Sequence, residues 1–131
     1  MTPRLDAVSI VTADLAASLD FYRRLGVPLP ADAASQPHVE AVLPGGLRLL
    51  WDTEDVISSF DPAWEKPQGG ERLGLAFLCG SAAEVDATYD DLIAAGYSGH
   101  LKPWNAQWGQ RYAVVLDPDG LGVSLFAAIA E

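Results

Sequence analysis

The strongest constraint on the fold of this chain is an order of predicted elements that occurs twice. Each copy begins with a strand, continues with a helix that a glycine ends, and closes with two strands joined by a turn. The first copy contains a strand at 5–12, a helix at 15–25, Gly26 and strands on either side of a turn at 44–46. The second contains a strand at 73–79, a helix at 82–95, Gly96 and strands on either side of a turn at 117–120. This repetition predicts an α+β fold in which two tandem βαβββ modules, residues 5–51 and 73–127, form one cupped mixed sheet within a single domain, 1–131.

The two helices carry start and stop signals as well as apolar stripes. Asp14 can accept hydrogen bonds from the free N–H groups of the first helix, and Ser81 with Glu84 forms a capping-box pattern at the second. Glycine after each stripe supplies the left-handed residue that commonly ends a helix. Both modules are therefore predicted to pack a helix on a sheet.

Two segments fit the repeat less well. Residues 52–72 are predicted to link the modules, with a short helical turn at 55–60. A loop of that length is uncommon unless it is functional or partly helical. Residues 98–110 are predicted to be irregular and are rich in tryptophan and amide side chains.

The composition narrows the class of partner. The formal net charge is −10, and the eight Lys and Arg residues are scattered, which argues against binding to nucleic acid or to an anionic membrane. No apolar stretch has the length of a membrane helix, and the first residues do not resemble a signal peptide. The single cysteine, Cys79, excludes an internal disulfide and is interpreted as a small buried apolar residue. We expect a reduced, cytoplasmic protein.

Two separated motifs resemble the glyoxalase/bleomycin-resistance superfamily, also called the vicinal oxygen chelate superfamily. The first is DLAASLDFYRRLG at 14–26, and the second is WGQRYAVVLDPDG at 108–120. The resemblance covers nearly the whole chain. Enzymes of that superfamily hold a divalent metal with His and Glu or Gln, and the resemblance implies that those positions fall at Ala7, Leu49, Gly74 and Ser124. These residues offer no adequate donor set, so we expect no metal and no other cofactor.

The sequence is most similar to the drug-binding branch of the superfamily, the mitomycin resistance type. The correspondence covers residues 37–43, 48–49, 51–53, 100–105 and 108–113. It implies a homodimer that binds a planar aromatic drug between aromatic side chains, with His38 and Trp108 at the clamping positions. We therefore expect a binding protein rather than an enzyme, one that sequesters a planar aromatic antibiotic or its biosynthetic intermediate in self-resistance.

Further ligand-binding candidates come from the aromatic and amide residues, and each has a structural alternative. Trp104 could contact the ligand or have a purely structural packing role. Trp51 could line the inner face of the cupped sheet or pack in the core. The polar candidates could bond either to the ligand or to the backbone of their own loop. The full predicted ligand-binding set is His38, Trp51, Trp104, Asn105, Gln107, Trp108, Arg111 and Tyr112.

Two enzymatic alternatives stay open at this point. One is a lyase, isomerase or dioxygenase that binds its metal in a way not typical of the superfamily. The other is redox or isomerase chemistry without a metal, with His38 as proton donor or acceptor.

Overall fold

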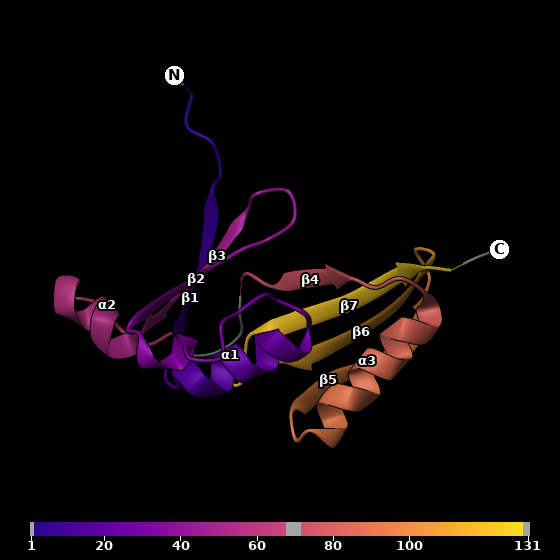
Figure 1. Cartoon of the computed structure of the whole chain (residues 1–131). Coiled ribbons are helices and arrows are strands. Elements are labelled where there is room, and N and C mark those ends of the chain that lie inside the picture. The colour runs from indigo at the N-terminus through magenta and orange to yellow at the C-terminus, as the bar shows by residue number, and fades with distance from the viewer. Residues whose placement is uncertain (1, 68–71, 130–131) are drawn as a thin grey trace. The chain divides into compact units, whose positions relative to one another are not determined.

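The computed structural model describes residues 2–67 and 72–129, and the chain divides into two compact units, Met1–Gln68 and Gly69–Glu131 (Figure 1). Each described unit contains one mixed sheet, and the described residues contain three α-helices in all. The prediction of an α+β fold is therefore confirmed. None of the helices in the described residues combines the length and the apolar character needed to span a bilayer.

Unit 1 is a three-stranded sheet with a helix packed on one face. Its elements are β1 (Ala7–Thr12), α1 (Leu15–Arg24), a short 3-10 helix η1 (Ala33–Ser35), β2 (His38–Val42), β3 (Arg48–Thr53) and α2 (Glu54–Phe60). The strand order is β1-β3-β2, with β1 parallel and β2 antiparallel to β3. Tyr22 of α1 contacts Trp51 of β3, with ring centroids 5.6 Å apart, and both side chains are fully buried. The core of this unit therefore lies between α1 and the sheet.

Helix α1 forms as its sequence predicts. The Asp14 carboxylate accepts from the Ala17 N–H at 3.1 Å and so caps the first turn. Leu15, Leu19 and Tyr22 are buried along one side of the helix. Gly26 has φ 93°, the left-handed conformation that glycine adopts without a steric cost.

Unit 2 is a four-stranded sheet with one face covered by its helix (Figure 1). Its elements are β4 (Leu75–Leu78), α3 (Ala82–Ala94), β5 (Ser98–Ala106), β6 (Gln110–Leu116) and β7 (Gly122–Ala128). The strand order is β4-β7-β6-β5, with β4 parallel to β7 and the other pairs antiparallel. Val85, Tyr89 and Leu92 form the buried side of α3. At its start, Ser81 accepts from the Glu84 N–H, and the Glu84 carboxylate accepts from the Gly80 N–H at 2.6 Å.

The structure corrects two details of the sequence analysis. Residues 98–106, predicted to be irregular, form strand β5. Described unit 1 contains three strands and not the four of a βαβββ module, because residues 27–37 form no strand. The predicted linker, 52–72, includes the end of β3 and all of α2, which confirms the predicted helical turn; residues 68–71 of it lie outside the described residues.

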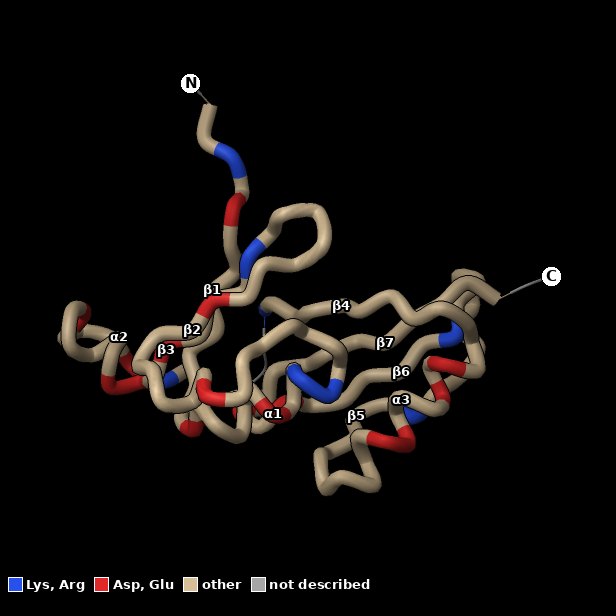
Figure 2. Tube along the Cα trace, in the orientation of Figure 1, with Lys and Arg blue, Asp and Glu red and all other residues tan. Residues whose placement is uncertain are grey.

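The charged residues of unit 2 lie largely away from the strands next to β7. In Figure 2 the traces of β4 and β7 carry no charged residue, whereas α3 carries several acidic ones. The single charged residue of β6 is Arg111. Strands β4, β6 and β7 therefore carry one charged side chain between them.

Candidate functional site

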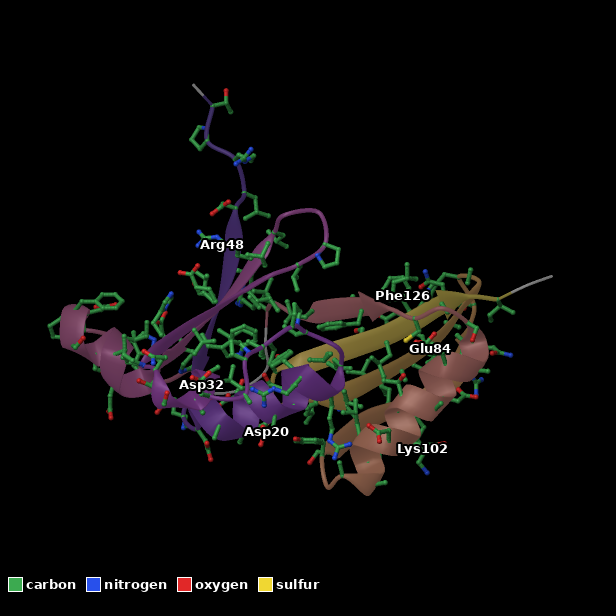
Figure 3. The ribbon with its side chains drawn as sticks, viewed as in Figure 1. Asp20, Asp32, Arg48, Glu84, Lys102 and Phe126 are labelled. Atoms are coloured by element: carbon green, nitrogen blue, oxygen red, sulfur yellow. The ribbon has the colours of Figure 1, made fainter. Side chains whose placement is uncertain are left out.

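The face of the unit 2 sheet that points away from α3 carries aromatic and apolar side chains. Successive side chains of a strand point to opposite faces. Ala113 and Val115 of β6 are fully buried on the α3 side, so Tyr112 and Val114 point to the other side, the open face. Register extends this face to the neighbouring strands: Phe126 of β7 and Trp104 of β5 both lie opposite Tyr112. Figure 3 marks Phe126 on β7.

Four rings on this face form one aromatic cluster, Trp104, Trp108, Tyr112 and Phe126. The ring centroids of Trp104 and Trp108 lie 6.0 Å apart with the planes at 90°. Tyr112 contacts both indoles edge-on, at 5.6 Å from Trp104 and 5.4 Å from Trp108. Tyr112 and Phe126 stack at 6.3 Å with their planes 27° apart. These contacts belong to the offset and edge-to-face arrangements that aromatic rings favour.

Trp108 is the most exposed ring of the cluster, with 56% of its surface accessible. It sits in the turn between β5 and β6, where Gly109 has φ 88°. Its indole Nε1–H donates to the Gln110 Oε1 at 2.9 Å. An indole in a tight hairpin turn can fold back over the sheet, and this one meets the rings of Trp104 and Tyr112. The exposed part of the cluster is thus a tryptophan whose indole is hydrogen-bonded to Gln110 and contacts two further rings.

The polar residues of the predicted ligand-binding set in unit 2 lie outside the aromatic cluster. Arg111 points to the α3 side, where its guanidinium binds the Asp86 carboxylate at 2.9 and 3.2 Å. Asn105 lies opposite Arg111 in the register and accepts from it at 3.1 Å. The two are therefore on the face opposite the aromatic cluster, and they stabilise the contact between sheet and helix. Gln107 is exposed in the turn beside Trp108.

Trp51 lies in the core of unit 1. It is fully buried and packs against Tyr22 of α1. Of the two interpretations that the sequence left open, the structure supports core packing. Trp51 is therefore not a member of the aromatic cluster.

The open face of the unit 1 sheet carries charges instead of rings. Five side chains, Asp52, His38, Glu40, Arg48 and Asp6, form a chain of hydrogen bonds that we call the charged cluster. His38 Nδ1 lies 2.6 Å from the Asp52 carboxylate, and His38 Nε2 lies 2.9 Å from the Glu40 carboxylate. Arg48 donates to Glu40 at 2.6 Å and to Asp6 at 2.6 and 3.2 Å. Figure 3 marks Arg48 on its strand.

These contacts favour the charged forms of His38 and its neighbour. Hydrogen bonds to Asp52 and then to Glu40 raise the pKa of His38 above its ordinary value of 6.5. The hydrogen bond from His38, followed by the one from Arg48, lowers the pKa of Glu40. With both ring nitrogens facing carboxylates, the imidazolium can donate on both sides, whereas the neutral ring can donate on only one. The charged cluster therefore favours the protonated form of His38.

A comparison of the sequence with known protein families identifies the superfamily of this chain. Residues 4–125 match the Glyoxalase/Bleomycin resistance protein/Dioxygenase superfamily. The chain belongs to this superfamily. The match spans both units and includes every residue of the aromatic cluster except Phe126.

Solved structures of the superfamily share the fold at low sequence identity. A glyoxalase/bleomycin resistance protein/dioxygenase family enzyme from Burkholderia phytofirmans PsJN is 21% identical, with a TM-score of 0.83 over 97% of this chain and 100% of that one. A glyoxalase/bleomycin resistance protein/dioxygenase from Nocardioides is 26% identical, with a TM-score of 0.75 over 98% and 85%. A glyoxalase-related enzyme from Fulvimarina pelagi is 19% identical, with a TM-score of 0.80 over 96% and 88%. The comparison with curated proteins gave no match.

The residues at the superfamily's implied metal positions do not fit a metal. Ala7 offers only a methyl group, and the residue opposite it is Arg48, a cation. Leu49 is buried on the same face as Trp51, away from the charged cluster. Gly74 has no side chain, and Ser124 lies opposite Ala76, so one hydroxyl is the sole donor.

No group of three or more His, Cys, Asp or Glu side chains in residues 2–67 and 72–129 has the arrangement of a metal site. A divalent ion needs three or four such donors.

Two members of the site are absent from the predicted ligand-binding set. Phe126 stacks on Tyr112, and Gln110 holds the indole of Trp108. Phe126 shares a face of β7 with the half-buried Ser124, and the pairing of β7 with β6 places it opposite Tyr112. Gln110 follows Trp108 by two positions, but only the turn geometry shows that the two side chains meet. The predicted partners Trp104, Trp108 and Tyr112 are brought together.

Proposed function

We propose that this protein binds a planar aromatic antibiotic, or its biosynthetic intermediate, and sequesters it without a metal. The observation that carries the proposal is the aromatic cluster on the open face of unit 2. Its most exposed member, Trp108, presents an indole next to two further rings. Stacking of a flat ring on one aromatic face contributes about 1–3 kcal/mol. Such contacts recognise flat ligands and tolerate differences in ring identity.

Binding is favoured over metal-assisted catalysis by the chemistry of the implied metal positions. A methyl group, a buried leucine, a glycine and one serine hydroxyl replace the usual donors. Relatives with similar folds are described as enzymes, so an enzymatic role is the competing function. Metal analysis of protein purified without chelators separates the two: stoichiometric Zn, Ni, Fe or Mn would favour a lyase, isomerase or dioxygenase.

The similarity to the mitomycin resistance type adds two further parts to the proposal. The protein acts as a homodimer in the cytoplasm, and His38 joins Trp108 in clamping the ligand. His38 and Trp108 each have an accessible side chain. Light scattering on the purified protein tests the dimer: a monomer at micromolar concentration would remove the clamp from the proposal.

The direct test is a titration with mitomycin-like and quinoxaline-type compounds. Trp108→Ala removes the most exposed ring, so the affinity is expected to fall by about five- to hundredfold, the equivalent of one stacking contact. Tryptophan fluorescence and isothermal calorimetry measure it. Phe60→Ala is the matched control, because Phe60 is 69% exposed at the end of α2 and lies outside the aromatic cluster. Equal affinities of wild type and Trp108→Ala across the panel would contradict the proposal.

A further inference from the structure

The hydrogen bond between Trp108 and Gln110 determines how the exposed indole can meet a ligand. We infer that Gln110 is a positioning residue: it occupies the indole N–H, so that a ligand meets Trp108 through the carbon face of the ring. The inference rests on the proposed function. It narrows the expected class of ligand. Because the indole N–H is bonded to Gln110, it cannot donate to a ligand, and flat rings that stack on the indole are favoured.

The backbone around Trp108 is fixed before the side chain is considered. Ala106 and Gln110 are paired at the ends of β5 and β6, which leaves a three-residue loop, 107–109. Within it, the Gly109 N–H donates to the Ala106 carbonyl at 3.0 Å, and Gly109 adopts a positive φ of 88°. The Ile129 N–H donates to the Gly109 carbonyl at 3.1 Å and ties the loop to the chain after β7. Three-residue hairpin loops commonly end in such a left-handed glycine.

The side chain of Gln110 reaches the indole from the same face of the sheet. Gln110 precedes Tyr112 by two residues on β6, so both side chains point to the open face. Its Oε1 accepts from the Trp108 Nε1–H at 2.9 Å. An indole has one polar hydrogen and no acceptor. With that hydrogen taken, the accessible surface of Trp108 offers only carbon atoms and the π system.

The neighbouring rings define the plane in which the indole is held. Trp108 stands at 90° to Trp104 and at 78° to Tyr112, with centroid distances of 6.0 and 5.4 Å. These edge contacts restrain one side of the ring, and the bond to Gln110 restrains the nitrogen. An exposed side chain without the second restraint would be ordered only on binding, which lowers affinity. By holding the indole before the ligand binds, Gln110 therefore reduces the entropy cost of ordering Trp108.

Two substitutions separate the acceptor from the bulk of the side chain. Gln110→Met keeps the length and removes the acceptor, whereas Gln110→Glu keeps an oxygen acceptor. Acridine at pH 8, a neutral flat tricycle, is the probe, and calorimetry measures its affinity for the full chain. We expect Gln110→Met to weaken binding by about two- to tenfold, the cost of ordering one side chain, and Gln110→Glu to stay within about twofold of wild type.

A second readout reports on the hydrogen bond itself and needs no ligand. The indole N–H of Trp108 gives its own resonance in a ¹⁵N-correlated spectrum, assigned by its loss in Trp108→Phe. Its hydrogen exchange should be faster in Gln110→Met than in wild type and unchanged in Gln110→Glu. Equal exchange in wild type and Gln110→Met would overturn the inference and leave the proposed function intact.

The double variant shows whether Gln110 acts through Trp108. If it does, Gln110→Met has no further effect on acridine affinity when residue 108 is already Phe. Additive losses would overturn the inference, since Gln110 would then contact the ligand directly. Acridine that binds wild type and Trp108→Ala equally would instead contradict the proposed function.

Discussion

The two units build the same kind of helix-covered sheet, and they differ on the face that the helix leaves open. In both, the first strand runs parallel to the last, and a glycine with positive φ follows the long helix, Gly26 at 93° and Gly96 at 98°. The open face of unit 1 carries the charged cluster, and that of unit 2 carries the aromatic cluster. The helix-covered faces of the two sheets are thus similar, because both pack the fold's core. The open faces differ in chemistry.

A second difference lies in the segment that follows each glycine. In unit 2 this segment becomes β5, which brings Trp104 to Tyr112. In unit 1 it contains Pro28, Pro30 and Pro37 and forms only the short helix η1. Proline lacks the N–H that a strand donates to its neighbour, so three in one segment oppose pairing with a sheet. The aromatic cluster therefore exists in unit 2 because that unit has a strand to carry it.

The largest expected effect tests the helix side that the units share. Leu19 of α1 and Leu92 of α3 are both fully buried, so each substitution by alanine should lower the free energy of unfolding by about 2–5 kcal/mol. Leu78→Ala is the control: Leu78 is 74% exposed, and its removal should cost less than about 0.5 kcal/mol. Urea denaturation measures all three. If only one of the two substitutions costs less than about 1 kcal/mol, the two helix faces are not equivalent.

The next effect tests what β5 requires of the helix beneath it. A Cβ at Gly99 would overlap the hydroxyl of Tyr89, a residue that is only 8% exposed. Gly99→Ala should therefore lower the free energy of unfolding by about 1–3 kcal/mol through overpacking.

Tyr89→Phe supplies the matched test of the cause. In the double variant the hydroxyl is gone, so part of the loss should be recovered, and the remaining ring and Ile93 limit the recovery because they also lie close. A double variant whose loss is the sum of the two single losses would rule out this overlap as the cause.

Much of the fold was predictable because its signals are local. The caps at Asp14 and Ser81, the stripe on α1 and the glycine stops each act within one or two turns of helix, and the structure has them as predicted. Strand β5 was not predictable in this way. It contains Pro103, which reads as a breaker, yet β5 lies at the edge of its sheet, where a missing N–H can face solvent. Edge position is a property of the whole sheet and is not encoded locally.

The candidate site was predictable in its residue types and not in its faces. Trp104, Trp108 and Tyr112 were expected to act together, and register brings them together. Arg111 and Asn105 belong to the same stretch, but a one-residue offset along a strand turns a side chain to the opposite face. Without the pairing of β5 with β6, the sequence could not separate these two sets. In the same way, the role of Trp51 depends on Tyr22, which lies far away in the sequence.

The smallest expected effect concerns the charged cluster and is a pH dependence. The folded pKa of His38 is raised above 6.5 by Asp52 and Glu40, while Arg48 and Asp6 continue the chain of charges. A raised pKa means that the protonated form stabilises the folded state fully below pH 6.5, and this stabilisation is lost as the pH rises through the folded pKa. The effect is small because solvent screens these exposed side chains.

His38→Gln removes the titrating group, so the stability difference between wild type and variant should shrink as the pH rises from about 6 to about 9. Urea denaturation at several pH values measures the difference, and the Hε1 proton shift of His38 gives its folded pKa directly. His100→Gln, on β5 and outside the charged cluster, is the control for removal of a histidine. A His38 that titrates at or below 6.5 would mean that the carboxylates do not hold its proton. Arg48 would then be the cation of the charged cluster on the open face of unit 1, without a contribution from His38.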